Sequence, residues 1–185
     1  MFNEQKTAQI AAFFLGKTQE KRMPHLKLTK LLYLADREAV RVLGLSMTGD
    51  HLVAMPYGPV LTKTLDLMRG SIESAPGGWD DLISGIENYE VSVRKKLNVH
   101  EMDKLSQAEI DVLESVWEQF GQMDQWEISE WTHRNCSEWE NPQGSSWPIS
   151  YYSVARAVGF DDESAIAIAE RFDEQQYIDN FFSAL

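Results

Sequence analysis

The sequence predicts a mainly helical fold, in which residues 1–185 form a single compact domain around a central helix at residues 27–43. Three observations lead to this prediction. Apolar residues recur at helical spacing in several stretches of the chain. Strand candidates are short and lie near residues 51–55, 89–94 and 97–101, enough for a small antiparallel β-sheet. With 185 residues, of which 43% are hydrophobic, the chain can bury a core without disulfides or a metal.

Two helices are predicted before residue 45. In residues 4–18, Ile10, Phe13 and Phe14 share one helical face, and Met23-Pro24 ends the pattern. In residues 27–43 most apolar side chains fall on one stripe, formed by Leu28, Leu31, Leu32, Ala35, Ala39, Val42 and Leu43. Tyr33 and Leu34 lie outside that stripe, which predicts a helix contacted on more than one side. Gly44 suits its C-terminal cap.

The middle of the chain alternates short strands with helices. Pro56 ends the strand candidate at 51–55, and a helix is expected from Pro59 to about Arg69, followed by a loop at 70–80. Tyr89, Val91 and Val93 alternate with polar residues, so 89–94 and 97–101 are expected to pair as a hairpin. A capping box at Ser106–Glu109 opens the next helix, and a shorter helix is expected at 127–133.

The C-terminal part is predicted as an ordered loop followed by a helical extension at 151–185. Residues 136–150 are rich in Ser, Asn, Gly and Pro but contain Trp139 and Trp147, aromatics that favour burial. A short helix at 151–158 ends at Gly159, and Asp161-Asp162 caps the last helix. The apolar face of that helix consists of Ala165, Ile168, Ala169 and Phe172. We expect Phe181 and Phe182 to dock the C-terminus.

The charge distribution restricts the class of partner. The formal net charge is −12, with +4 in residues 1–72 and −16 in residues 73–185. A chain that repels phosphate on average is a poor candidate for binding nucleic acid or an anionic membrane surface. Cys136 is the sole cysteine, no signal peptide pattern is visible, and apolar runs are far shorter than the roughly 20 residues that span a bilayer. We expect a cytoplasmic protein with no membrane partner.

Residues that could carry chemistry do not form a convincing site. His133 and Cys136 lie three residues apart, but Glu130, Glu138 and Glu140 surround them, whereas a reactive cysteine needs electropositive surroundings. The sequence lacks metal-ligand spacings and a phosphate-binding loop. We therefore predict no catalytic residues, no metal site and no cofactor, and expect that the protein is not an enzyme. One alternative is a hydrolase that uses His133 together with a carboxylate.

Tryptophan is concentrated in one region of the chain. Five of the six tryptophans lie in the second half, at Trp117, Trp126, Trp131, Trp139 and Trp147. Trp117 follows the apolar stripe of its helix and is expected in the core. For Trp126, Trp131 and Trp147, burial in the core and exposure as interface anchors stay open, because tryptophan serves both purposes.

Three segments together resemble a known family. They are Lys27–Asp36, the run Tyr57-Gly58-Pro59-Val60, and Thr132-His133 followed by Trp139. Over residues 5–140 the chain resembles the Panacea domain, the SocA-like antitoxin family that also occurs as phage-associated proteins. The matched motif positions are Leu28, Lys30, Leu31, Tyr33, Asp36, Tyr57, Gly58, Pro59, Val60, His133 and Trp139. The resemblance implies a mostly helical domain with a small sheet that binds a toxin protein directly and holds it inactive.

From this resemblance we expect the antitoxin of a toxin–antitoxin system, with a cognate toxin as partner. One family member acts as an adaptor that delivers its toxin to an ATP-dependent protease. A protease adaptor or phage-encoded interaction module without a toxin of its own is therefore the alternative. Lys30, Tyr33, Asp36 and Tyr57 are expected to form either a buried hydrogen-bonded group or a surface that grips the toxin. The expected partner-binding residues are Lys30, Tyr33, Tyr57, Trp126, Trp131 and Trp147. The acidic, tryptophan-rich half favours a basic partner, and a homo-oligomer stays open.

Overall fold

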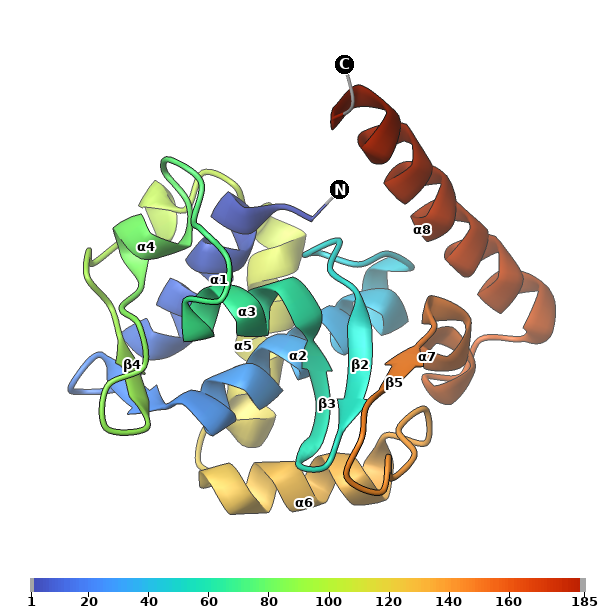
Figure 1. Cartoon of the computed structure of the whole chain (residues 1–185), viewed down its shortest axis with the longest axis horizontal. Helices are drawn as coiled ribbons and strands as arrows, with labels where there is room; N and C mark the ends of the chain where they lie inside the picture. The colour runs from blue at the N-terminus through green and yellow to red at the C-terminus, as the bar shows by residue number, and fades with distance from the viewer. Residues whose placement is uncertain (1, 184–185) are drawn as a thin grey trace.

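The computed structural model describes residues 2–183, with side chains described through residue 178. The fold is mainly helical, as predicted, and carries small antiparallel sheets (Figure 1). In chain order the elements are α1 (Glu4–Gly16), β1 (Arg22–Pro24), α2 (His25–Leu43), β2 (Leu52–Met55), β3 (Gly58–Leu61), α3 (Thr62–Arg69), α4 (Trp79–Leu82), β4 (Glu90–Ser92), η1 (Val99–Glu101), α5 (Gln107–Phe120), α6 (Gln125–Asn135), β5 (Trp147–Ile149), α7 (Tyr151–Ala157) and α8 (Asp162–Ser183).

Helix α2 is the centre of the molecule. It contacts α1, α5, α6, α7 and strands β1 and β3, which surround it in Figure 1. Most of the predicted apolar stripe and the residues outside it are buried, since Leu28, Leu31, Tyr33 and Leu34 are at most 3% exposed. The stripe was predicted too long at its C-terminal end, where Val42 is 52% exposed. Gly44 ends the helix in the left-handed conformation at φ +68°, as expected for a C-terminal glycine cap.

The strands form two separate antiparallel sheets. Strand β2 lies between β3 and β5, and β1 pairs with β4. The β2–β3 hairpin places Met55 opposite Gly58, so that Pro56 and Tyr57 form its tip. Strand β5 adds to the other edge of β2, with Trp147 opposite Ala54. Strands β2 and β5, which lie more than 90 residues apart in sequence, thereby belong to one sheet.

The predicted strand near residues 97–101 is wrong. Residues Val99–Glu101 form the short 3₁₀ helix η1, because the Glu101 carboxylate accepts the Asn98 backbone N–H at 2.8 Å and completes a capping box. Strand β4 covers Glu90–Ser92 within the predicted 89–94 segment, and it pairs with β1 rather than with 97–101. Periodicity along the chain shows that a strand forms and carries no information about which distant segment pairs with it.

The helix that was expected from Pro59 begins at Thr62 instead. Gly58–Leu61 are fully buried and extend as β3 along β2. The carboxylate of Asp50 accepts the backbone N–H groups of Lys63 and Thr64, at 3.0 and 2.8 Å, and so fixes the start of α3. The helix start is therefore set by a residue 12 positions upstream of Thr62 rather than by a proline inside the predicted helix.

The other predicted elements form with small shifts in their ends. Ser106 and Glu109 make the expected capping box of α5. Helix α6 begins two residues before the predicted 127–133 segment, after a second capping box at Asp124 and Glu127. Trp147 does not contribute to a buried loop, because it lies in β5 with 59% of its surface exposed.

The C-terminal part of the chain forms two helices, α7 and α8, and α7 packs against the central helix α2. Helix α8 contacts α7, and Figure 1 shows it running along the edge of the fold. Asp161 caps α8 through the Ser164 N–H at 2.8 Å, and Ala165 and Ile168 are buried, as their predicted face requires. The side chains of Phe181 and Phe182 lie outside the described residues. Among the described helices, none is long and apolar enough to cross a membrane.

Candidate functional site

Several motif residues meet where α2, the β2–β3 hairpin and α6 touch. Lys30 on α2 donates a hydrogen bond from Nζ to the Pro59 carbonyl oxygen at 2.9 Å. Ser129 on α6 donates from Oγ to the Tyr57 carbonyl oxygen at 2.8 Å. The backbone of the hairpin tip is thus held from two sides by side chains of two helices, and Tyr57 is presented between them.

Gly58 is required at this junction for two reasons. Its φ of +98° is a conformation that residues with a Cβ rarely adopt. A Cβ at this position would also lie 2.6 Å from the Thr132 hydroxyl and 3.0 Å from the Lys30 amino group. The absence of a side chain therefore allows the hairpin to approach α2 and α6 closely enough for the Lys30 hydrogen bond to form.

Lys30 is a fully buried lysine, with 0% of its surface exposed. Burial lowers the pKa of its amino group from 10.5 to about 7, because a low-polarity interior disfavours the charged form. The hydrogen bond to Pro59 uses one of the three N–H groups that a lysine ammonium carries. The amino group therefore retains N–H groups beyond this bond, and Lys30 also lines the cavity described below.

His133 and Trp139 attach the C-terminal end of α6 to the hairpin. Their rings stack with centroids 4.1 Å apart and planes 9° apart. Trp139 Nε1 donates to the Met55 carbonyl oxygen at 3.0 Å, at the end of β2. Burial, with a smaller contribution from the nearby Lys30 charge, lowers the pKa of His133. Nε2 of His133 is buried and has no hydrogen-bond partner among the described residues.

Tyr33 and Cys136 belong to a buried polar group about one helical turn further along α2 from Lys30. The Tyr33 hydroxyl and Arg37 Nε both donate to Glu138 Oε1, each at 2.6 Å. Burial raises the pKa of the Tyr33 hydroxyl, and the Glu138 charge raises it further. Burial also raises the pKa of the Cys136 thiol to about 12, so this cysteine is protonated at neutral pH and is a poor nucleophile.

Asp36 fixes the loop between α2 and β2. Its Oδ1 accepts the Met47 and Thr48 backbone N–H groups, both at 2.9 Å, and its Oδ2 accepts the Tyr151 hydroxyl at 2.7 Å. The carboxyl group is 1% exposed, and burial raises its pKa while these hydrogen bonds oppose the shift. Of the two expectations for the polar motif residues, the structure places Lys30, Tyr33 and Asp36 in buried hydrogen-bonded groups.

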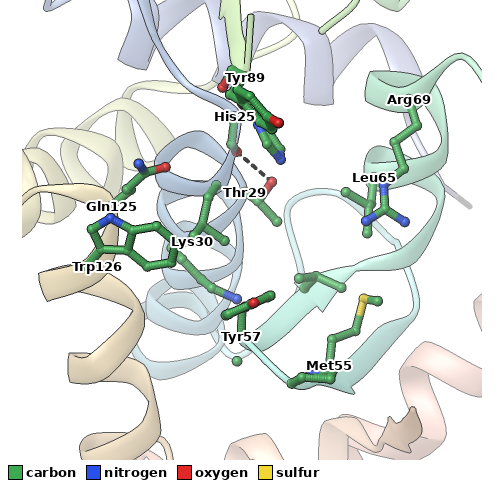
Figure 2. Close-up of a pocket in the computed structure, with 14 residues that line it drawn as sticks. His25, Thr29, Lys30, Met55, Tyr57, Leu65, Arg69, Tyr89, Gln125 and Trp126 are labelled. Carbon is green, nitrogen blue, oxygen red and sulfur yellow. Dashed lines mark hydrogen bonds between the residues drawn. The ribbon is translucent and has the colours of Figure 1, made fainter. Parts of the chain in front are cut away.

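A cavity of about 510 Å³ opens beside Lys30. It lies between the N-terminal half of α2, the hairpin, α3 and the start of α6, as Figure 2 shows. Its walls consist of His25, Leu26, Thr29, Lys30, Met55, Pro56, Tyr57, Gly58, Val60, Leu65, Arg69, Tyr89, Gln125 and Trp126. The volume is in the range typical of ligand pockets, roughly 300–1,000 Å³.

Exposed aromatic side chains form the rim of this cavity. Tyr57 and Trp126 are 62% and 58% exposed and meet edge to face with ring centroids 6.1 Å apart. Tyr89 is 78% exposed and stacks on His25, with centroids 6.4 Å apart. Large exposed aromatics around a hollow are typical of protein interfaces, where they supply contact area at low entropic cost.

The structure brings together three of the six predicted partner-binding residues. Lys30, Tyr57 and Trp126 line the cavity, although they come from α2, the hairpin and α6. Tyr33 is buried away from it, and Trp131 packs on Phe120 with ring centroids 4.6 Å apart. Trp147 is exposed on β5 and is not part of the cavity wall.

Sequence reasoning missed His25, Arg69 and Tyr89 as cavity residues. Tyr89 was noted only as the first apolar residue of a strand pattern, and its backbone carbonyl accepts the His25 backbone N–H at 2.9 Å. Arg69 ends α3 and carries no motif. No local signal identifies them, because the fold alone brings them to the cavity. Among the described residues, no group of three or more His, Cys, Asp or Glu side chains is placed to hold a metal ion.

Comparison with known proteins gives one match. A family model described as "Antitoxin SocA-like, Panacea domain" matches residues 28–140, which is more than half of the chain. This range contains most of α2, the hairpin, α6 and Trp139, and therefore nearly all of the cavity wall. No curated protein and no solved structure matches the chain.

Proposed function

Because the chain belongs to the family of SocA-like antitoxins with a Panacea domain, we propose that it neutralises a cognate toxin by direct protein–protein binding, without catalysis. One observation carries this proposal. Four of the family motif residues, Lys30, Tyr57, Gly58 and Val60, line a cavity that has exposed aromatics at its rim. A surface of this kind favours binding of a protein partner.

The motif residues divide into supporting and contacting roles in this proposal. Leu28, Leu31 and Val60 are buried packing residues. Lys30 and Gly58 fix the hairpin tip, through a hydrogen bond and a close approach that excludes a Cβ. Tyr57 is then the motif side chain that contacts the toxin, together with Trp126 and with Tyr89, which are not motif residues.

The surroundings of the nucleophile and base candidates support binding rather than catalysis. Cys136 is 1% exposed, and a thiol with a pKa of about 12 supplies almost no thiolate at neutral pH. His133 is stacked on Trp139, and its Nε2 atom is buried. A hydrolytic base must reach both a substrate and a water molecule, and a buried ring nitrogen is poorly placed to do so.

Co-expression with the product of the neighbouring gene tests the proposal. We expect that product to stop growth when expressed alone and to be harmless when this chain is present, with both proteins recovered in one complex. A product that is harmless alone, or that stays toxic while this chain is present and folded, would contradict the proposed function. His133→Phe serves as a control for catalysis, because it removes the base but keeps an aromatic ring against Trp139. A folded variant is expected to neutralise fully.

A further inference from the structure

The wall of the cavity has an unusual charge for this protein. The whole chain contains 29 Asp and Glu residues against 17 Lys and Arg, yet none of the 14 residues that line the cavity is acidic. Two of them, Lys30 and Arg69, carry strongly basic side chains, and His25 adds an imidazole. The cavity is therefore a locally basic site in an acidic molecule.

The two basic groups are not neutralised by carboxylates of the described chain. Lys30 donates to the Pro59 carbonyl, and no described Asp or Glu forms an ion pair with Lys30 or Arg69. Figure 2 shows them on different sides of the same space, with the Lys30 amino group next to Tyr57. A buried amino group without an anionic partner favours a ligand that brings an acceptor, because charge-assisted hydrogen bonds are strongest where water is excluded.

The remainder of the wall is apolar and aromatic. Leu26, Met55 and Leu65 line the interior, while Tyr57 and Trp126 stand at the rim. A simple inorganic anion would leave most of this apolar surface uncovered. The wall instead matches a ligand that combines a carboxylate with an adjacent hydrophobic side chain, and a volume of about 510 Å³ accommodates a few side chains of a peptide.

We propose that this cavity receives a short segment of the toxin in which an Asp or Glu stands next to an aromatic or aliphatic residue. The carboxylate pairs with Arg69, the exposed cation of the wall, while Lys30 adds a basic group on the buried side of the cavity. The hydrophobic side chain inserts between Tyr57, Trp126 and Leu65. The inference rests on the proposed function in naming the toxin as the source of the segment. It also refines the expectation of a basic partner, because Trp126 lies in the acidic half of the chain but faces a site without carboxylates.

Matched pairs of variants separate the cavity from the rest of the surface. Trp126→Ala is compared with Trp147→Ala, since the two tryptophans are 58% and 59% exposed and only Trp126 lines the cavity. Arg69→Gln is compared with Arg94→Gln, another exposed arginine outside the cavity. All four changes are at exposed positions, and circular dichroism verifies that each variant is folded.

The probe is a random dodecapeptide library displayed on phage and selected on the immobilised full chain. We expect the enriched peptides to share an acidic residue beside an aromatic or aliphatic one. Their affinity should fall at least tenfold with Trp126→Ala and with Arg69→Gln, and stay within twofold for Trp147→Ala and Arg94→Gln. Replacing the peptide carboxylate by its amide should weaken binding to the unmodified chain but cause no further loss with Arg69→Gln.

Three results would overturn the inference: no enrichment, enriched peptides without an acidic residue, or affinities that the cavity variants leave unchanged. The same variants in the co-expression assay distinguish this failure from failure of the proposed function. If all four variants neutralise the toxin as well as the unmodified chain, the antitoxin function stands and the cavity is not the toxin site. If the unmodified chain does not neutralise, the proposed function itself is lost.

Discussion

At the scale of single residues, Lys30 shows how a side chain can support the fold and also serve the candidate site. It is fully buried, holds the hairpin through Pro59 and reaches the cavity with the same amino group. Helical periodicity alone places Lys30 opposite the apolar stripe, and only the family resemblance offered a buried hydrogen-bonded group as one of two expectations for it. The hairpin covers it, and that covering depends on Gly58 having no side chain.

The lowered pKa of Lys30 makes part of the stability dependent on pH. Above about pH 7 the folded chain releases a proton that the unfolded chain retains until about pH 10.5. The Lys30 contribution to the free energy of unfolding therefore rises between pH 7 and 8.5, by on the order of 1 kcal/mol per pH unit. Lys30→Met should remove this increase, whereas Lys95→Met, at an exposed lysine, should keep it. Urea unfolding at several pH values measures both slopes, and equal slopes for Lys30→Met and the unmodified chain would contradict this assignment.

At the scale of elements, the C-terminal extension is joined to the central helix by one buried hydroxyl. Tyr151 at the start of α7 donates to Asp36 on α2 at 2.7 Å and lies 3.0 Å from the Asp50 carbonyl oxygen. Asp36 in turn holds the loop that leads into β2. Helix α7 thereby supports the loop that leads into the hairpin, although residues 151–185 lie beyond the matched family range.

Removal of that hydroxyl should destabilise the whole chain. Tyr151→Phe leaves Oδ2 of the buried Asp36 without its donor, which we expect to cost about 1–3 kcal/mol of unfolding free energy. Tyr152→Phe is the matched control, because its hydroxyl bonds Asp162 at the surface and its loss should cost less than about 0.5 kcal/mol. Chemical denaturation of both variants gives the comparison. If the two variants lose similar amounts of unfolding free energy, the hydrogen bond to Asp36 does not account for the effect of Tyr151→Phe.

Part of the fold could be predicted from the sequence alone, element by element. Elements with local signals were predictable: the apolar stripe of α2, its Gly44 cap and the Ser106 capping box all form as expected. Features set by distant partners were not. Strand β4 pairs with β1 rather than with 97–101, and the start of α3 is fixed by Asp50.

At the candidate site, the motif residues around the hairpin were predictable, because Gly58 and Pro59 have distinctive backbone requirements. Tyr57 was selected as a polar motif residue and Trp126 as one of the clustered tryptophans, and the structure places the two rings in contact. Arg69 and Tyr89 could not be selected from the sequence. They reach the cavity only because α3 and the segment before β4 fold back toward α2.

At the scale of the whole molecule, the structure relates the charge asymmetry along the chain to the cavity. Residues 1–72 carry a net charge of +4 and supply most of the cavity wall, whereas residues 73–185 carry −16 and add Tyr89, Gln125 and Trp126. The basic cavity is therefore enclosed by an acidic chain. Such an arrangement restricts the partners that can approach and places the attractive charge at one point, which favours specificity over general affinity.

The central claim is neutralisation by stoichiometric binding, and a titration of purified toxin with this chain tests it most directly. Toxin activity should fall linearly as the chain is added and vanish at a fixed molar ratio, and added excess toxin should restore activity at once. An enzyme that inactivates toxin would instead abolish the activity of many equivalents over time. That second result, or toxin activity unaffected by excess folded chain, would contradict the account.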